Sequence, residues 1–319
     1  MFLQLSHLIG TVYKLLYRCK LTLCIRTNPF GFYTHSDILK LPFFIFKFML
    51  RKADHVLCNS LKTQKEIELR MDLQNVYTIP NGYDIRKIRQ MSEKTISPFE
   101  NLFETNKTIV HVGRLYYDKG QWHLIRIFGA IRKKMPCKLI IIGQGPLLTK
   151  LKSLALSLDL KVHIVEEGTT PDAEADVYFF GFRQNPYRFI KNASVFAFPS
   201  IFEGLPNAII ESLITGTPVV VADCPSGPRE IMREKTDLSI VATIPEESKY
   251  GYLMPPFSGK EIFDSSPLNE TEIVWQTTLT DLLCNESELD TLRKNTSDIA
   301  TKFDFEKIAL QWQQFITKV

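Results

Sequence analysis

The stretch FPSIFEGLPNAIIESLITGTPVVVADCPSGPREI runs from Phe198 to Ile231 and predicts a strand, a loop, a helix and a second strand. Pro206 stands where the helix begins, which suits its fixed φ and its missing N–H. Free amides and the helix dipole at such a start favour a bound anion. Glu203 lies in the loop, and Glu211 lies inside the apolar run AIIESLI, where an unpaired charge is costly. The stretch therefore predicts an anion-binding turn beside two carboxylates, which can accept hydrogen bonds from hydroxyl groups of a ligand.

Apolar, β-branched runs alternate with helical patterns through most of the 319 residues. Continuous apolar strands separated by helices indicate parallel sheets that are covered on both faces. We therefore expect an α/β protein with two Rossmann-like domains. The predicted strands cover residues 21–26, 55–59, 76–79, 108–112, 138–142, 177–180, 194–198 and 218–222.

A second motif, HVGRLYYDKG, occupies residues 111–120. A predicted strand runs into Gly113, a residue that permits close backbone approach. Arg114 and Lys119 follow at the carboxyl end of this strand, where ligands bind in open α/β sheets. Two cations at that position are placed to neutralise a diphosphate that leaves during a reaction.

Two weaker signals lie further along the chain. IIGQGP, residues 141–146, is a strand followed by a Gly-x-Gly turn at Gly143 and Gly145, and such a turn alone is weak support for a nucleotide site. In FFGF, residues 179–182, backbone atoms of Phe182 are placed to contact a base.

Together these motifs resemble glycosyltransferase family 4, which consists of retaining enzymes of the GT-B fold. The resemblance covers roughly residue 25 onward, and EGLPN and DCPSGPREI resemble members that use UDP-sugars to build capsule, lipopolysaccharide or related bacterial surface glycans. Four further segments also fit: ADHVLCNS at 53–60, TIPNGYD at 78–84, GYLMP at 251–255 and FDFEKIALQW at 303–312.

The resemblance implies a role for each matching residue. Arg114 and Lys119 would hold the donor diphosphate, Glu203 would contact the transferred sugar, and Glu211 would contact the ribose. We thus expect Glu203, Arg114 and Lys119 to be catalytic, with no bound metal and no cofactor beyond the UDP-sugar substrate. The expected donor-binding residues are Gly113, Arg114, Lys119, Gly143, Gly145, Phe182, Glu203, Gly204, Leu205, Pro206, Asn207 and Glu211.

The predicted function is transfer of a hexose or N-acetylhexosamine from a UDP-sugar to a glycan or lipid-linked acceptor. Two alternatives stay open at this point. One is a non-catalytic remnant that binds a nucleotide-sugar, and the other is a GT-B sugar-nucleotide epimerase, which should lack the arrangement of Glu203 and Glu211.

We predict a shortened amino-terminal acceptor domain at residues 1–100, a nucleotide-sugar domain at 101–300, and a terminal helix at 301–319 that packs back on the first domain. The polar segment 89–107 is the predicted linker. No Gly-rich turn precedes Leu21, and the amino-terminal histidine typical of the family cannot be assigned. Arg26 occupies a comparable place, and His35 is a more distant candidate.

Basic residues concentrate at the front of the chain, although the net charge is only +4. This distribution favours an anionic membrane surface as a partner, whereas nucleic acid is disfavoured because no nucleic-acid-binding motif accompanies the charges. The six cysteines lack metal-type spacing and indicate reduced thiols, so we expect a cytoplasmic protein. From the basic front we expect attachment to the inner face of the plasma membrane. Eight cations and one acid, Asp37, lie within residues 1–53: Lys14, Arg18, Lys20, Arg26, Lys40, Lys47, Arg51 and Lys52.

Overall fold

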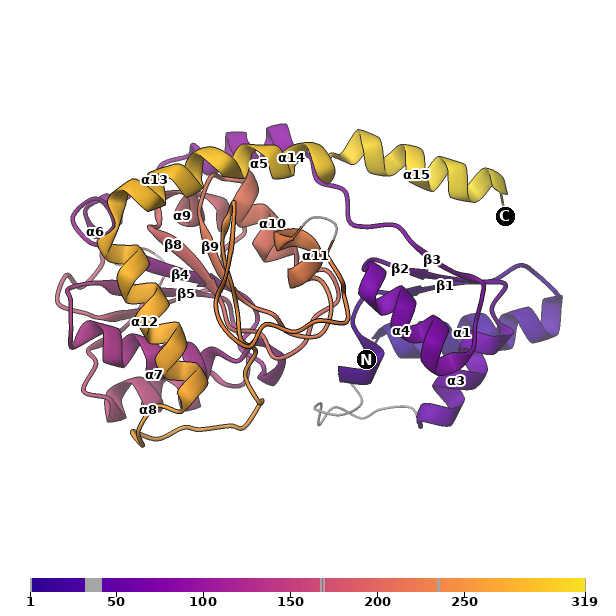
Figure 1. The fold of residues 1–319 in the computed structure, drawn as a ribbon, viewed down its shortest axis with the longest axis horizontal. Helices are drawn as coiled ribbons and strands as arrows, with labels where there is room; N and C mark the ends of the chain where they lie inside the picture. Colours follow the sequence, from indigo (N-terminus) through magenta and orange to yellow (C-terminus); the bar gives the residue numbers. More distant parts are fainter. Residues whose placement is uncertain (1, 32–41, 167, 169, 234–235, 319) are drawn as a thin grey trace.

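A computed structural model describes residues 2–31, 42–166, 168, 170–233 and 236–318. It contains two α/β domains that lie side by side, each built on its own sheet (Figure 1). The smaller domain comes first in the chain, and the larger one contains the stretch that decides the fold.

The amino-terminal domain has a three-stranded parallel sheet in the order β1-β2-β3. A small core of buried residues, including Met49, Val56 and Ile67, holds its helices to this sheet. Its elements are α1 (Phe2–Tyr17), β1 (Thr22–Ile25), α3 (Phe43–Lys52), β2 (His55–Cys58), α4 (Leu61–Met71) and β3 (Val76–Thr78).

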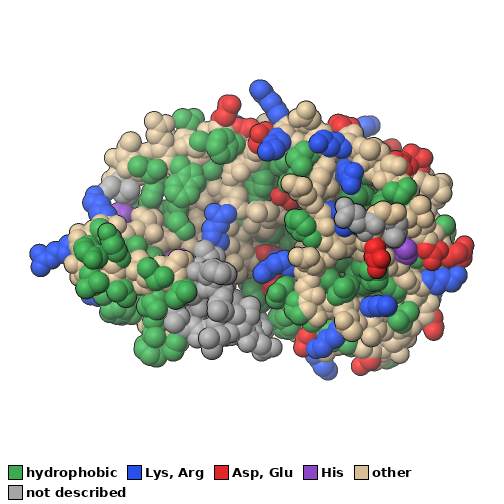
Figure 2. All heavy atoms as spheres, turned by 180° about the vertical axis from the view of Figure 1, so that it is seen from behind, with side chains coloured by type: hydrophobic (Ala, Val, Ile, Leu, Met, Phe, Trp, Pro, Cys, Tyr) green, Lys and Arg blue, Asp and Glu red, His purple; other side chains and the backbone are tan. Residues whose placement is uncertain are grey.

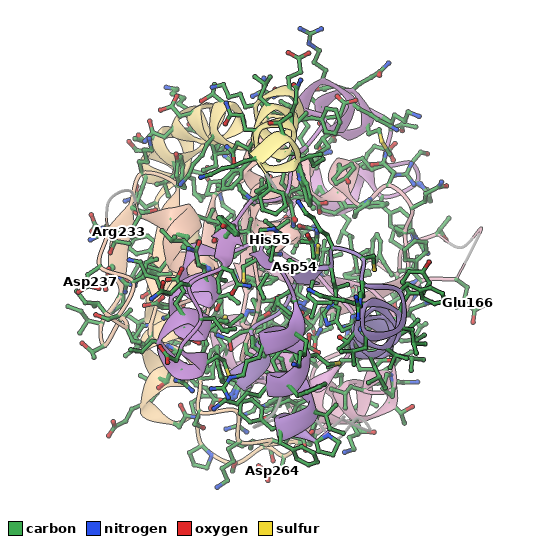
Figure 3. All side chains as sticks on the ribbon, turned by 90° about the vertical axis from the view of Figure 1, so that its right-hand side faces the viewer. Asp54, His55, Glu166, Arg233, Asp237 and Asp264 are labelled. Atoms are coloured by element: carbon green, nitrogen blue, oxygen red, sulfur yellow. The ribbon has the colours of Figure 1, made fainter. Side chains whose placement is uncertain are left out.

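Polar contacts at the start of β2 join α1 to this sheet. Asp54 Oδ2 accepts a hydrogen bond from Leu21 N at 2.6 Å and pairs with Lys14 Nζ at 2.5 Å. The ring of His55 lies edge-on to that of Phe315 at 5.8 Å between centroids, which connects β2 to the carboxyl-terminal helix. Figure 3 shows Asp54 and His55 side by side at the start of β2.

The larger sheet has eight strands in the order β10-β11-β9-β8-β4-β5-β7-β6, and all neighbours are parallel except β10 and β11. Its strands are β4 (Thr108–Val112), β5 (Lys138–Ile142), β6 (Val162–Ile164), β7 (Val177–Gly181), β8 (Val195–Phe198), β9 (Val219–Ala222), β10 (Glu246–Ser248) and β11 (Gly251–Met254).

Helices cover both faces of this sheet, and a large hydrophobic cluster lies on each side. Full burial explains why β5 reads as the continuous apolar run LIII. The α-helices of this domain are α5 (Ile85–Ser92), α6 (Glu100–Glu104), α7 (Gln121–Arg132), α8 (Leu148–Ser157), α9 (Tyr187–Asn192), α10 (Asn207–Ile214), α11 (Pro228–Met232), α12 (Glu270–Cys284), α13 (Glu286–Asn295) and α14 (Ile299–Lys302). The last helix of the chain, α15 (Phe305–Lys318), belongs to the smaller domain.

The predicted linker at residues 89–107 is wrong. The helix α6 and the second half of α5 fall within it, and both helices pack on the larger sheet. Three apolar side chains explain this packing. The Phe99 ring lies tilted against Phe180, with 4.8 Å between centroids, and the Phe103 ring lies 6.2 Å from that of Phe189 between centroids. Ile96 is buried in the same cluster.

The chain instead crosses between the domains just after β3, and it returns just before α15. The two crossing segments are hydrogen-bonded to each other, since Tyr83 N donates to Phe303 O at 2.9 Å and Phe305 N donates to Tyr83 O at 3.0 Å. The helix α15 then runs over the smaller domain, where Ile308 is buried against Leu57 and Ile79.

Candidate active site

The carboxyl ends of both sheets face the cleft between the domains. Arg26, Asn59 and Asn81 follow β1, β2 and β3, and they line a 370 Å³ cavity together with Lys119 and Glu203 of the larger domain. Ligands bind outside the carboxyl ends of strands in open α/β sheets. A single ligand bound in the cleft can therefore contact both domains.

A second cavity, of 760 Å³, lies beside the first within the larger domain. Val112, Gly113 and Glu211 line both cavities, so the two form one continuous site. Together they contain eleven of the twelve predicted donor-binding residues: Gly113, Arg114, Lys119, Gly143, Gly145, Phe182, Glu203, Leu205, Pro206, Asn207 and Glu211.

Gly204 is the predicted residue that lines neither cavity. It forms an isolated antiparallel bridge with Thr27, and a Cβ placed on it would lie 2.2 Å from Arg26 O. Asn28 N also donates to Glu203 O at 2.9 Å. Gly204 is thus required where the backbones of the two domains meet, and this packing fixes the loop that carries Glu203.

Lys119 and Glu203 form a buried ion pair at the floor of the smaller cavity. Lys119 Nζ lies 2.5 Å from Glu203 Oε1 and 3.2 Å from Asp118 Oδ2. Burial opposes a charge on Lys119, but the two carboxylates outweigh it and raise its pKa. Burial also raises the pKa of Glu203, and the ammonium of Lys119 counteracts that rise. The pair places a cation and a carboxylate side by side in a site screened from water.

Arg114 is the more exposed of the two predicted phosphate ligands. Its side chain is 67% exposed, its NH2 atom lies 3.6 Å from Asp118 Oδ2, and its guanidinium lies 4.9 Å from the Tyr116 ring. Gln121 Nε2, which the sequence analysis did not single out, donates to Arg114 O at 2.7 Å and lies 3.3 Å from Nε2 of His111. Burial lowers the pKa of His111 to about 4, so this ring supports the loop in its neutral form.

The Gly-x-Gly turn packs directly on the Arg114 loop. A Cβ on Gly143, whose φ is +150°, would lie 1.9 Å from Gly113 O, and a Cβ on Gly145 would lie 2.4 Å from Leu115 O. Both glycines are therefore needed for the close approach of two backbone segments. This close packing shapes the larger cavity, which both glycines line.

Glu211 stands at the junction of the cavities. Burial raises its pKa to about 6, and Tyr187 Oη donates to its Oε1 at 3.4 Å. In the larger cavity Phe182 is 64% exposed, so its ring and backbone are open to a ligand. A carboxylate beside an aromatic and backbone-lined cavity suits a nucleoside, with its ribose hydroxyls at the carboxylate.

The amino-terminal wall of the cleft was not predicted, apart from the mention of Arg26. Arg26 NH2 donates to Asn81 Oδ1 at 2.6 Å, and Asn81 Nδ2 donates to Asn207 Oδ1 at 2.5 Å. Tyr83 Oη donates to the same oxygen at 2.6 Å. The signal that could have revealed this wall is that polar residues follow three successive strands. His35 lies outside the described residues.

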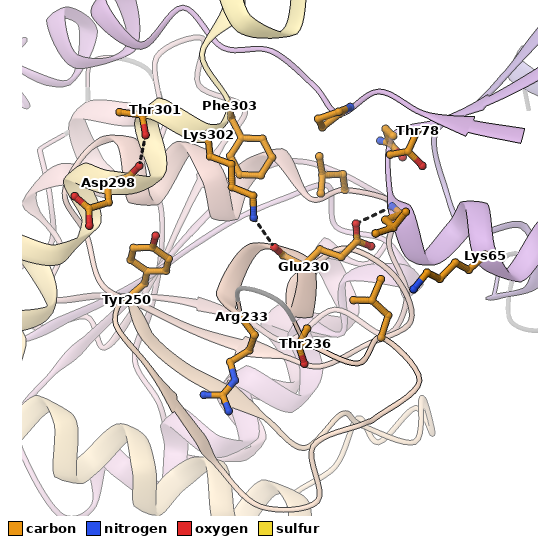
Figure 4. A pocket seen from close by; sticks show the side chains of 15 residues that line it. Lys65, Thr78, Glu230, Arg233, Thr236, Tyr250, Asp298, Thr301, Lys302 and Phe303 are labelled. Carbon is orange, nitrogen blue, oxygen red and sulfur yellow. Dashed lines mark hydrogen bonds between the residues drawn. The ribbon is translucent and has the colours of Figure 1, made fainter. Parts of the chain in front are cut away.

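A third cavity, of 650 Å³, lies on the other side of Leu205 between the domains (Figure 4). Here Glu230 of α11 caps the first turn of α4. Its carboxylate accepts from Ser60 Oγ at 2.5 Å, Leu61 N at 2.7 Å and Lys62 N at 3.1 Å. Favourable contact between an acidic side chain and a helix amino terminus explains how this pairing holds the domains together.

Comparison with known proteins agrees with this geometry. Residues 106–250 match the family described as Glycosyl transferases group 1. A crystal structure of HepE from Anabaena in complex with UDP and glucose superimposes with a TM-score of 0.71 and 18% identity, covering 99% of this chain and 76% of that one. The fold is therefore GT-B, the two-domain architecture of this class of glycosyltransferases.

Curated relatives extend the match beyond the larger domain. An uncharacterized glycosyltransferase of Methanocaldococcus jannaschii is 34% identical over 317 residues, which cover 97% of this chain and 74% of that protein. An N-acetylgalactosaminyltransferase of Campylobacter jejuni, named for a diphospho-undecaprenol substrate, is 32% identical over 59% of this chain and 46% of its own length. The chain belongs to the group 1 glycosyltransferase family.

Proposed function

We propose that the chain is a retaining glycosyltransferase that moves a hexose or N-acetylhexosamine from a UDP-sugar to a glycan or lipid-linked acceptor. The observation that carries the proposal is the buried pair of Lys119 and Glu203 in a cavity that Glu211 also lines, where this cavity joins the larger one. This spacing offers separate contacts for the diphosphate, the sugar and the ribose of one donor.

The donor would bind with its uracil beside Phe182 and its ribose hydroxyls on Glu211. Its diphosphate would lie between Lys119 and Arg114, and the hydroxyls of its sugar would contact Glu203. The reaction breaks the bond between the anomeric carbon and the phosphate oxygen and forms a bond to an acceptor hydroxyl on the same face. The acceptor proton passes to the departing phosphate oxygen, so UDP leaves and no enzyme nucleophile is needed.

The same cations support a mechanism without a bound metal. Lys119 and Arg114 supply positive charge where negative charge develops on the leaving diphosphate, which is the role a divalent ion plays elsewhere. Transfer should therefore persist in excess chelator. A loss of activity with chelator that added magnesium restores would contradict this part of the proposal.

The acceptor class is supported by the names of relatives. The Campylobacter relative is named for a lipid-linked diphosphate substrate, which supports the acceptor class. The Anabaena structure holds UDP and glucose, which supports a UDP-sugar donor. We extend this to bacterial surface polysaccharides such as capsule or lipopolysaccharide, within the family 4 subset of retaining enzymes. A non-catalytic remnant and an epimerase are the alternatives, and transfer of radiolabelled sugar from a UDP-sugar to a lipid-linked acceptor distinguishes both from the proposal.

The proposal includes a cytoplasmic location on the inner face of the membrane. The surface formed by α1 and α3 exposes large apolar side chains, among them Leu16 at 69% and Phe44 at 73%. Basic side chains of the same two helices border them, and Figure 2 shows hydrophobic side chains gathered on this domain. Within the described residues, no helix is long and apolar enough to cross a membrane.

Vesicle co-sedimentation tests this attachment. Binding should require anionic lipid and should fall as salt rises, because each nearby cation contributes about 1 kcal/mol that salt screens. Phe44→Ser should weaken binding, whereas Leu69→Ser, which changes an 84% exposed leucine on α4, should not. Equal partitioning onto neutral vesicles would contradict an electrostatic attachment.

A further inference from the structure

Arg26 differs from the other cations of the cleft in its charge environment. Lys119 contacts two carboxylates, and Arg114 lies near one. Within the described part of the chain, the Arg26 side chain hydrogen-bonds only to a neutral oxygen, Asn81 Oδ1 at 2.6 Å. Among the described residues, no carboxylate is hydrogen-bonded to Arg26 or paired with it where it lines the 370 Å³ cavity.

The position of Arg26 is fixed by both backbone and side-chain contacts. Arg26 O accepts from Asn59 Nδ2 at 3.4 Å, and the next residue, Thr27, bridges to Gly204. Asn81 orients the guanidinium and is itself held by Asn207 of the opposite domain at 2.5 Å. Arg26 is exposed to solvent, yet these contacts hold its guanidinium in one orientation, which favours binding of a ligand in the cleft.

Across the cavity from Arg26 stand Lys119 and the start of α10, the elements proposed to hold a diphosphate. Guanidinium groups bind phosphate oxygens with two parallel hydrogen bonds and remain charged at all physiological pH values. A guanidinium that faces the proposed phosphate-binding residues across the cavity is thus complementary to the same class of anion.

We propose that Arg26 binds a substrate diphosphate from the amino-terminal side of the cleft, so that both domains hold one anion and Asn81 positions the arginine. The proposal rests on the proposed function, because it assigns a second wall to that donor site. The diphosphate belongs either to the nucleotide donor or to a lipid-linked acceptor, and the two sources are separable by experiment.

The test uses the full chain and three variants. Arg26→Ala removes the cation. Asn81→Asp keeps the shape of the side chain but places a carboxylate against the Arg26 guanidinium. Arg86→Ala, on an exposed position of α5 that lines none of the three cavities described above, is the control for loss of one positive charge.

Calorimetry with UDP and with uridine gives the first readout. Arg26→Ala should weaken UDP binding by about 10- to 100-fold, the effect of one charge-assisted hydrogen bond, and should leave uridine binding unchanged. Asn81→Asp should also weaken UDP binding, and Arg86→Ala should stay within about twofold of the parent. This pattern assigns the diphosphate to the donor.

Inorganic pyrophosphate added to UDP-saturated protein gives the second readout. Unchanged UDP binding together with loss of pyrophosphate binding in Arg26→Ala assigns the diphosphate to the acceptor and also supports the proposal. Unchanged binding of both ligands would overturn it. Failure of the parent chain to bind UDP would overturn the proposed function, and pyrophosphate titrated into the protein without UDP would still decide the role of Arg26.

Discussion

The two domains place their ligand-facing residues in different ways. In the larger domain, eight strands and two hydrophobic clusters hold loops whose residues are close in sequence, such as 113–119 and 203–211. In the smaller domain, three short strands each contribute one polar residue, and contacts to the larger domain orient Asn81. The difference teaches that the donor side is held mainly by the core of its own domain, whereas the opposite wall depends more heavily on the interface.

Hydrogen exchange should show the largest contrast between the domains. Amides in β4 and β5 lie at the centre of the larger sheet, where opening requires the whole domain to unfold. Amides in β1 and β3 lie at the edges of a small sheet, and we expect them to exchange about 1000-fold faster or more, which corresponds to roughly 4 kcal/mol. Equal protection in both sheets would mean that the chain opens as one unit.

Removal of the carboxylate at Glu203 should have the next largest effect. Glu203→Gln keeps the side-chain shape but loses the charge beside Lys119, so sugar transfer should fall on the order of 100-fold. UDP affinity should change much less, because the contact is to the sugar. Steady-state transfer assays and UDP calorimetry on the same preparation separate the two effects.

Arg114→Gln should weaken UDP binding by about 10- to 100-fold, since a charge-assisted hydrogen bond to phosphate is lost. Uridine binding should not change. Lys133→Gln removes one exposed cation from the same domain and serves as the control. If UDP and uridine weaken equally in Arg114→Gln, the arginine does not contact the diphosphate.

A smaller effect is expected from pH. Burial raises the pKa of Glu211 to about 6, so the carboxylate that accepts from the ribose hydroxyls is present above that pH and is lost below it. UDP affinity should therefore rise severalfold from pH 5 to pH 7. The phosphate of UDP titrates in the same range, and Glu211→Gln, which should lose only the protein's contribution, is the comparison that isolates it.

Much of the larger domain could be predicted from the sequence. All eight predicted strands are present, and five of them belong to the larger sheet, where continuous burial leaves a continuous apolar signal. The strands β6, β10 and β11 were missed. Strands β6 and β10 are short and carry partly exposed residues, so their pattern resembles that of loops.

The wrong linker and the missed cleft wall have a common cause. Ile96, Phe99 and Phe103 are scattered among polar residues in the sequence. Their burial becomes visible only in the folded protein, where they share a cluster with the distant residue Phe189. Likewise, Arg26 and Asn81 lie far apart in sequence and meet only in three dimensions. Local patterns predict elements and short loops, but contacts between distant segments require the tertiary structure.

The central claim is that the larger domain provides the nucleoside contacts of the donor and binds its diphosphate through Lys119 and Arg114, with Arg26 added from across the cleft. A crystal structure with bound UDP tests it most directly. We predict uracil beside Phe182, ribose hydroxyls on Glu211, and the diphosphate beside Lys119. UDP bound in the cavity at Glu230, or held mainly by residues of β1 to β3, would contradict the account.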